Sequence, residues 1–69
     1  MAVEKAVDLV GTGPTVEEAV AEALDRAIMT LEGVTSFDVV SVSGTLDGRR
    51  VTYRVRLRVW FTLLERMHG

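Results

Sequence analysis

The chain has 69 residues and a mass of 7.6 kDa, which is the size of one small domain and excludes a multidomain enzyme. Hydrophobic residues form 48% of the sequence and charged residues 26%, a composition typical of folded domains rather than of disordered chains. Cysteine is absent, which excludes disulfide bonds, thiolate metal sites and thiol nucleophiles. The apolar runs are too short to span a membrane and the N-terminal residues lack the pattern of a signal peptide, so we expect a cytoplasmic protein with no membrane partner.

The small size of the chain predicts self-association. A single core in a chain of fewer than about 70–80 residues seldom supplies more than about 3–5 kcal/mol. With no disulfide and no structural zinc site, association with further copies is the remaining common way to bury enough apolar surface. We therefore expect a homo-oligomer.

Charge is distributed unevenly along the chain, although the net charge is only −2. Residues 1–48 carry two basic and nine acidic residues, a net charge of −7, whereas residues 49–69 carry six arginines and one glutamate, a net charge of +5. Parts of opposite charge attract each other within a subunit or between subunits.

The first two predicted elements are a strand and a helix. Residues 3–10 alternate with a period of two and predict a short strand, which Gly11-Thr12-Gly13-Pro14 is expected to end. Thr15, followed three residues later by Glu18, forms a capping box and predicts the start of a helix, and Gly33 is expected to end it. An apolar stripe at steps of three or four residues marks the buried side of this helix: Val16, Val20, Ala23, Leu24, Ala27 and Leu31.

Two further strands follow the helix. Residues 37–46 predict the second strand, and Phe37 at its start is expected to be a core residue. The apolar residues change parity between Val39 and Val40, which predicts either a β-bulge or a change of face. Asp47-Gly48 predicts a hairpin turn. A third strand over residues 51–63 would be about 40 Å long against a usual ~17–20 Å, so we expect it to bend or to pair beyond its own subunit. One face of this strand is apolar and is expected to be buried: Tyr53, Val55, Leu57, Val59, Phe61 and Leu63.

The predicted fold is therefore α+β, a single β-α-β-β domain over residues 1–69 with a three-stranded antiparallel sheet wrapped on one helix. In its order of elements, its length and five short segments, the chain resembles the dodecin family. The resemblance implies a subunit of a hollow homododecamer that binds flavin, as FMN or riboflavin, in pairs at subunit interfaces for storage and protection, without turnover. The segments are Asp8-Leu9-Val10-Gly11-Thr12, Ala23-Leu24-Asp25-Arg26-Ala27, Phe37-Asp38-Val39, Thr52-Tyr53-Arg54-Val55 and Val59-Trp60-Phe61.

Three residues depart from the family pattern at the implied flavin site. The tryptophan that stacks on the flavin in the family precedes the Phe-Asp-Val segment, and Ser36 occupies that position here. Arg54 replaces a glutamine that bonds the polar edge of the flavin, and Trp60 stands where the family has a small residue. The implied ligand-binding residues are thus Ser36 and Arg54, with Arg56 and Trp60 as further candidates.

Two hypotheses follow from the polar side of the third strand, where Arg54, Arg56, Arg58 and Trp60 share one face by parity. In the first, the arginines bind phosphate and Trp60 stacks on a planar ligand, so the cage sequesters a flavin or a similar planar anion. In the alternative, a structural cage of the same fold has lost flavin binding. The arginines then pair across subunit interfaces with acidic residues of the helix or with Glu4, Asp8 and Asp38, and Trp60 fills a subunit interface. Nucleic acid is not an expected partner, because the overall charge is negative.

No catalytic or metal-binding residue is predicted. His68 is the one histidine and stands one residue from the C-terminus, and no serine has an evident base partner, so an enzyme is not expected. Three acidic residues share a helix face that we expect to be solvated rather than to bind a cation: Glu18, Glu22 and Asp25.

Overall fold

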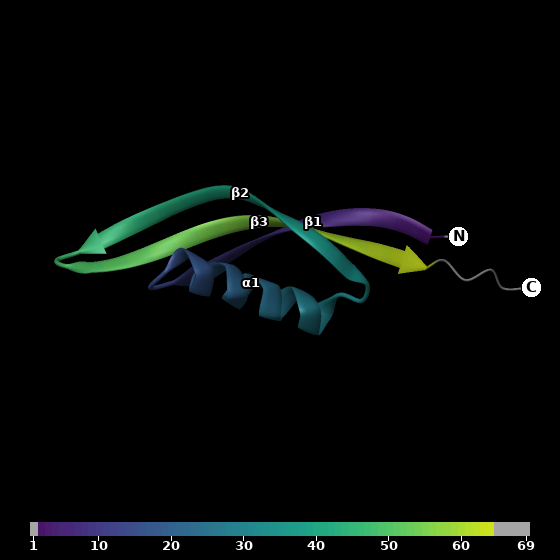
Figure 1. Ribbon diagram of the computed structural model, residues 1–69, viewed down its shortest axis with the longest axis horizontal. Helices are drawn as coiled ribbons and strands as arrows, with labels where there is room; N and C mark the ends of the chain where they lie inside the picture. The colour runs from purple at the N-terminus through teal and green to yellow at the C-terminus, as the bar shows by residue number, and fades with distance from the viewer. Residues whose placement is uncertain (1, 65–69) are drawn as a thin grey trace, which may run out of the picture.

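The computed structural model describes residues 2–64 and contains one helix and three strands (Figure 1). The elements are β1 (Ala2–Gly13), α1 (Val16–Thr30), β2 (Val34–Asp47) and β3 (Arg50–Leu64). The strands form a single antiparallel sheet in the order β1-β3-β2, so β3 lies at the centre and pairs along almost its whole length. The predicted α+β architecture, with β-α-β-β order and a three-stranded sheet on one helix, is confirmed.

The helix begins where the sequence predicts but ends earlier than the predicted residue, Gly33. The hydroxyl of Thr15 accepts a hydrogen bond from the backbone N–H of Glu18 at 3.1 Å, which caps the first turn. The last helical residue is Thr30, and the backbone N–H of Leu31 donates to the carbonyl of Ala27. Gly33 follows with a φ of +71°, a conformation that glycine adopts readily, and redirects the chain into β2.

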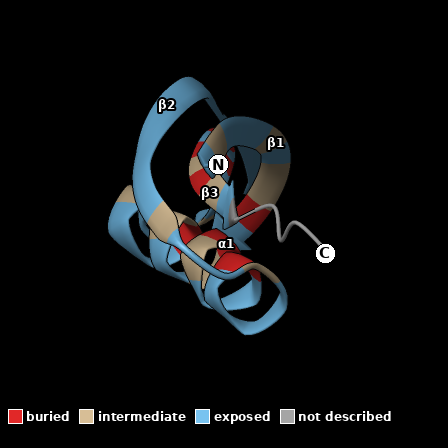
Figure 2. Cartoon of the chain, turned by 90° about the vertical axis from the view of Figure 1, so that its right-hand side faces the viewer, coloured by how far each residue is buried: buried red, intermediate tan, exposed pale blue. Residues whose placement is uncertain are grey.

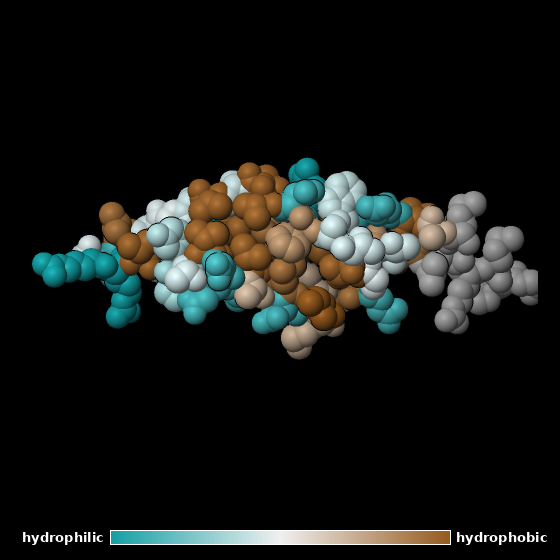
Figure 3. All heavy atoms as spheres, in the orientation of Figure 1, coloured by the Kyte–Doolittle hydropathy of each residue, from teal (hydrophilic) through white to brown (hydrophobic). Residues whose placement is uncertain are grey.

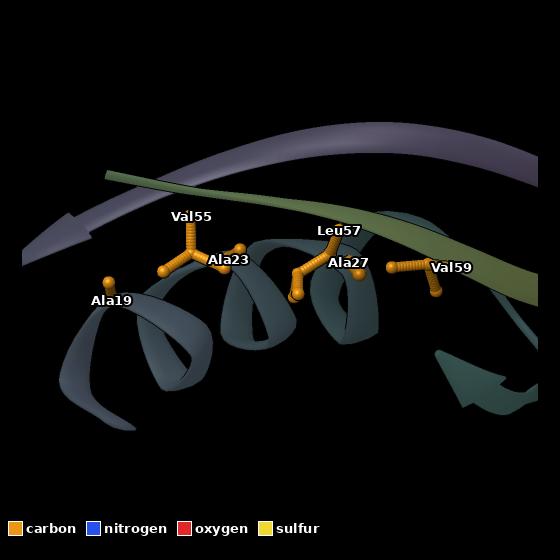
Figure 4. Packing of buried hydrophobic residues seen from close by; sticks show 6 residues of the cluster. All are labelled: Ala19, Ala23, Ala27, Val55, Leu57 and Val59. Atoms are coloured by element: carbon orange, nitrogen blue, oxygen red, sulfur yellow. The ribbon is translucent and has the colours of Figure 1, made fainter. Parts of the chain in front are cut away.

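The core is formed where the alanines of α1 meet the apolar face of β3. Figure 4 shows these side chains pointing toward one another across the gap between helix and sheet. Of the predicted helical stripe, Ala23 and Ala27 are fully buried, whereas its four larger members lie at the edges of the contact and are only partly buried. The prediction omitted Ala19, which is also fully buried. The fully buried residues of the cluster are Ala19, Ala23, Ala27, Val55, Leu57 and Val59.

The end of β1 corrects one prediction. Residues 11–13 do not end the strand but continue it, and they stay paired with β3. The glycines are required by the close approach of α1. A Cβ atom on Gly11 would lie 2.9 Å from the Cβ atom of Ala23, and one on Gly13 would lie 2.9 Å from the backbone nitrogen of Ala19. Small residues on both surfaces therefore let the helix lie close to the sheet.

Strand β2 contains the predicted bulge. Its pairing with β3 slips between Val39 and Ser41, which leaves Val40 as the extra residue. A second slip, between Val34 and Ser36, was not predicted. At the other end Asp47 pairs with Arg50, so the hairpin link is Gly48-Arg49, with Gly48 at a φ of +63°.

The helix covers β1 and β3 and leaves β2 almost bare. Every residue of β2 except Val34 is exposed, as the end-on view in Figure 2 shows. Phe37, which the sequence indicates as a core residue, is 43% exposed, and Leu46 is 76% exposed. Apolar side chains gather over β2 and α1 on the face seen in Figure 3. The exposed apolar residues of β2 are called here the β2 strip: Phe37, Val39, Val40, Val42 and Leu46.

Within the described residues, no helix combines the length and the apolar character that crossing a membrane requires.

Candidate ligand-binding face

All four predicted ligand-binding residues lie on the side of the sheet that faces away from α1. Side chains alternate along a strand, so the even-numbered residues of β3 point to the side opposite the buried core. The register places three residues side by side in each row across this helix-free face. In order along β3 the rows are Thr12–Arg54–Ser43, Val10–Arg56–Ser41, Asp8–Arg58–Asp38 and Ala6–Trp60–Ser36.

The row of Trp60 brings two of the predicted residues together. Ser36 on β2 is the direct partner of Trp60, and Ala6 is its partner on β1. The indole Nε1 donates a hydrogen bond to Oδ2 of Asp38 at 2.9 Å. Because both cross-strand neighbours are small, neither can extend across the indole ring.

The row of Arg58 is internally neutralised. The Nε and Nη2 atoms of Arg58 donate to the two carboxylate oxygens of Asp8 at 3.1 and 3.4 Å. This bidentate contact, together with the charges of Asp8 and Asp38, raises the pKa of the Arg58 guanidinium above its ordinary value. An arginine does pair with Asp8, but within one subunit and not between subunits as expected.

Arg54 and Arg56 have a different environment. Both are exposed, and their neighbours across the sheet are hydroxyl side chains and Val10 instead of carboxylates. Among residues 2–64, neither guanidinium forms an ion pair. These two side chains therefore present unneutralised positive charge, with fork-shaped donors that match a phosphate or carboxylate.

The structure does not bring all the predicted residues to one point of a single subunit. Arg54 is six residues from Trp60 along β3, which corresponds to about 20 Å at ~3.3 Å per residue. Since Ser36 lies opposite Trp60, it is separated from Arg54 by a similar distance. A small ligand that contacts both Ser36 and Arg54 must therefore lie between two subunits.

The acidic residues of α1 have a role that the sequence did not indicate. Oε2 of Glu22 accepts a hydrogen bond from the backbone N–H of Thr12 at 2.5 Å, and Oε1 lies 3.5 Å from Nη2 of Arg26. The Thr12 bond is the main reason why the pKa of Glu22 lies below its ordinary value. Arg26 in turn donates to the backbone carbonyl of Val10. These contacts connect the helix to β1.

Other predicted and missed residues can be placed briefly. Asp38 was named only as a possible ion-pair partner, and its bond to Trp60 was missed because it depends on the strand register. Tyr53 packs against the core as expected. His68 lies outside the described residues. Residues 2–64 contain no group of three or more histidine or acidic side chains arranged to hold a metal ion.

Comparison with known proteins agrees with this architecture. The family model described as Dodecin matches residues 3–64. The calcium dodecin of Mycobacterium tuberculosis is 35% identical over 65 residues, which cover 91% of this chain and 92% of that protein.

Solved structures extend the agreement to three dimensions. A mutant of the T. thermophilus dodecin is 40% identical, with a TM-score of 0.89, and the match covers 94% of this chain and all of that one. The dodecin from Streptomyces coelicolor is 33% identical, with a TM-score of 0.87 and coverage of 94% of this chain and 96% of that one. The chain belongs to the dodecin family.

Proposed function

We propose that this protein is a homo-oligomeric cage, a dodecamer by analogy with its family, that binds and sequesters a flavin or similar planar anion between subunits. The observation that carries this proposal is the helix-free face, where an indole with small neighbours lies on the same surface as two unneutralised arginines. The groups on this face include arginine donors, hydroxyl groups and an aromatic ring, which suit binding, and the two aspartates accept hydrogen bonds from Arg58 and Trp60. Storage without turnover is the role that fits them.

The exposed surface of the subunit supports self-association. The chain exposes 5410 Å², whereas a compact monomer of 7.6 kDa would expose about 4300 Å². The excess is comparable to the ~800 Å² that each partner buries in a standard interface. The β2 strip supplies apolar area for such a contact, and β2 also presents an unpaired edge.

The residues present fit a phosphorylated planar ligand. Ser36 gives no stacking surface, but the Trp60 indole lies directly opposite it. Arg54 and Arg56 carry charge that no carboxylate of residues 2–64 offsets, and their donor geometry suits the phosphate of FMN. Ser36, Arg54, Arg56 and Trp60 are the proposed ligand-binding residues, with the two ends of the face meeting across an interface.

Titration of the ligand-free protein with FMN and with riboflavin tests the proposal through quenching of flavin fluorescence. We expect both flavins to bind, and FMN to bind more tightly because of its phosphate. Arg56→Ala should weaken FMN more than riboflavin, whereas Arg49→Ala, which removes an arginine in the hairpin link, should leave both unchanged. Equal loss for the two flavins would refute the phosphate role.

Absence of quenching at micromolar flavin would instead favour a structural cage that has lost flavin binding. The specific observation behind this second function is the serine at position 36. The name of the M. tuberculosis relative makes Ca²⁺ a useful additive in a parallel titration.

A further inference from the structure

We infer that the aromatic platform of the ligand site has been transferred across the sheet, so that Trp60 on β3 stacks on the ligand and Asp38 is its positioning residue. This inference rests on the proposed function and specifies how that site recognises a planar ring. It assigns a separate part to each of three side chains: Trp60 the stacking surface, Asp38 the orientation of the indole, and Ser36 the open space beside it.

The strand register supports a stacking role for Trp60. Ser36 and Trp60 are direct partners in the β2–β3 pairing, and directly opposed side chains start about 4.5–5.5 Å apart. An indole that begins on β3 therefore reaches the same surface as an aromatic ring that begins on β2. A large residue at both positions would crowd this surface, whereas a serine paired with a tryptophan leaves one ring and room beside it.

The small neighbours of Trp60 also support this stacking role. On its other side the partner is Ala6, so the indole stands between two of the smallest side chains on the helix-free face. Trp60 itself is only partly buried within the subunit. Part of the indole is therefore accessible at the surface of the subunit, as stacking on a planar ligand requires.

The hydrogen bonds of Asp8 and Asp38 support the positioning role of Asp38. Asp8 engages both the Nε and the Nη2 atoms of Arg58. Asp38, on the other side of Arg58, instead accepts the indole N–H at 2.9 Å. The bond holds the indole by its N–H edge, so the platform is oriented before a ligand arrives. Such preorganisation lowers the entropic cost of binding.

The single tryptophan of the chain makes the inference testable by spectroscopy. Riboflavin is the probe, because it lacks a phosphate and reports on the ring alone. Stacking of an indole on an isoalloxazine produces a long-wavelength charge-transfer absorption band. We expect this band when riboflavin saturates the wild-type protein, and we expect it to be absent in Trp60→Phe. Trp60→Ala should weaken riboflavin binding by about tenfold or more.

Asp38 is tested as a positioning residue with paired variants. Asp38→Ala should weaken riboflavin several-fold and change the near-ultraviolet circular dichroism of Trp60, while Asp38→Asn, which keeps an acceptor oxygen, should restore much of both. Asp47→Asn is the matched control, since it removes a carboxylate at the hairpin end of the same strand, opposite Arg50, and should leave the Trp60 signal unchanged. Light scattering on each variant checks that assembly is retained.

The outcomes separate the two proposals. If wild-type protein binds riboflavin but shows no charge-transfer band, and Trp60→Phe binds equally tightly, the transfer of the platform is wrong while the proposed function stands. If neither FMN nor riboflavin binds the wild-type protein, the proposed function itself fails. If Asp38→Ala changes neither affinity nor the Trp60 signal, the positioning role of Asp38 is refuted.

Discussion

Replacement of Gly11 with alanine tests whether the small residues beneath α1 set the distance between helix and sheet. The added Cβ atom would lie 2.9 Å from the Cβ atom of Ala23 and 3.0 Å from its backbone nitrogen, and it would overlap the carbonyl oxygen of Ala19. Two of these three atoms belong to the helix backbone, which cannot rotate away as a side chain can. The whole helix must therefore move.

The magnitude follows from the required displacement. Carbon atoms pack at about 3.5–4.0 Å, so the 2.9 Å contact alone requires α1 to retreat by roughly 0.6–1.1 Å, and the overlap with the Ala19 carbonyl oxygen requires a larger shift. Overpacking of this kind typically costs about 1–3 kcal/mol. That is a large part of the about 3–5 kcal/mol that one core supplies in a chain of this size.

Gly44→Ala is the matched control. Gly44 lies on the bare strand β2, where an added Cβ atom meets its nearest neighbour, the carbonyl oxygen of Thr52, at an ordinary 3.5 Å. Both variants should be unfolded in denaturant under far-ultraviolet circular dichroism at equal protein concentration, because association contributes to apparent stability. A free energy of unfolding for Gly11→Ala within about 0.5 kcal/mol of that for Gly44→Ala would refute this account of the packing.

Three further predictions concern the core, the exposed strand and an acidic contact. Leu57→Ala should lower the free energy of unfolding by about 2–5 kcal/mol in the same assay, because this fully buried leucine leaves a cavity against the helix. Phe37→Asp should shift the assembly to smaller species in light scattering, because it places a charge in the β2 strip. Glu22 has a lowered pKa in the folded chain, so its contact with Thr12 stabilises the fold above the pKa of the unfolded chain and is lost as the pH falls through the folded value. Glu22→Gln should therefore flatten the acid side of the stability profile.

Each of these predictions has a control within the chain. Leu63→Ala, on the same face of β3 but 42% exposed, should cost much less than Leu57→Ala, and equal losses would contradict the position of the core. Phe37→Tyr should retain the assembly, whereas an unchanged mass for Phe37→Asp would remove the β2 strip from the interface. Glu17→Gln should leave the pH profile as it is; an identical change in both glutamate variants would refute the specific role of Glu22.

Local patterns were sufficient to predict the elements and their faces. The capping box, the alternation in β3 and the change of parity near Val40 each depend on residues that are close in sequence. The structure confirms all three, except that Leu63 at the end of the apolar face of β3 is exposed and not buried. Residues 11–13 were misread because glycine is equally suited to a turn and to a close approach of two backbones. The repeat of Ala19, Ala23 and Ala27 every four residues, a stripe of small side chains on the helix, was the pattern that could have resolved this ambiguity.

The candidate site was predictable only in part, for a geometric reason. Parity alone places Arg54, Arg56 and Trp60 on one face. Counting from the hairpin does not give the partner of Trp60 on β2, because the count depends on which two residues form the turn. It also depends on the slip between Val39 and Ser41, which moves the register by one residue. The pairing of Trp60 with Ser36, and its bond to Asp38, therefore required the structure.

The exposure of β2 also affects how much of the protein assembles into the proposed cage. A strand that its own chain leaves uncovered acquires its partners only from other copies, so the yield of finished cages follows the law of mass action. At low protein concentration a newly folded subunit keeps its sheet edge unpaired for longer, and unpaired edges promote irregular aggregation. The concentration of the protein would then determine not only how much ligand is stored but also whether the cage forms.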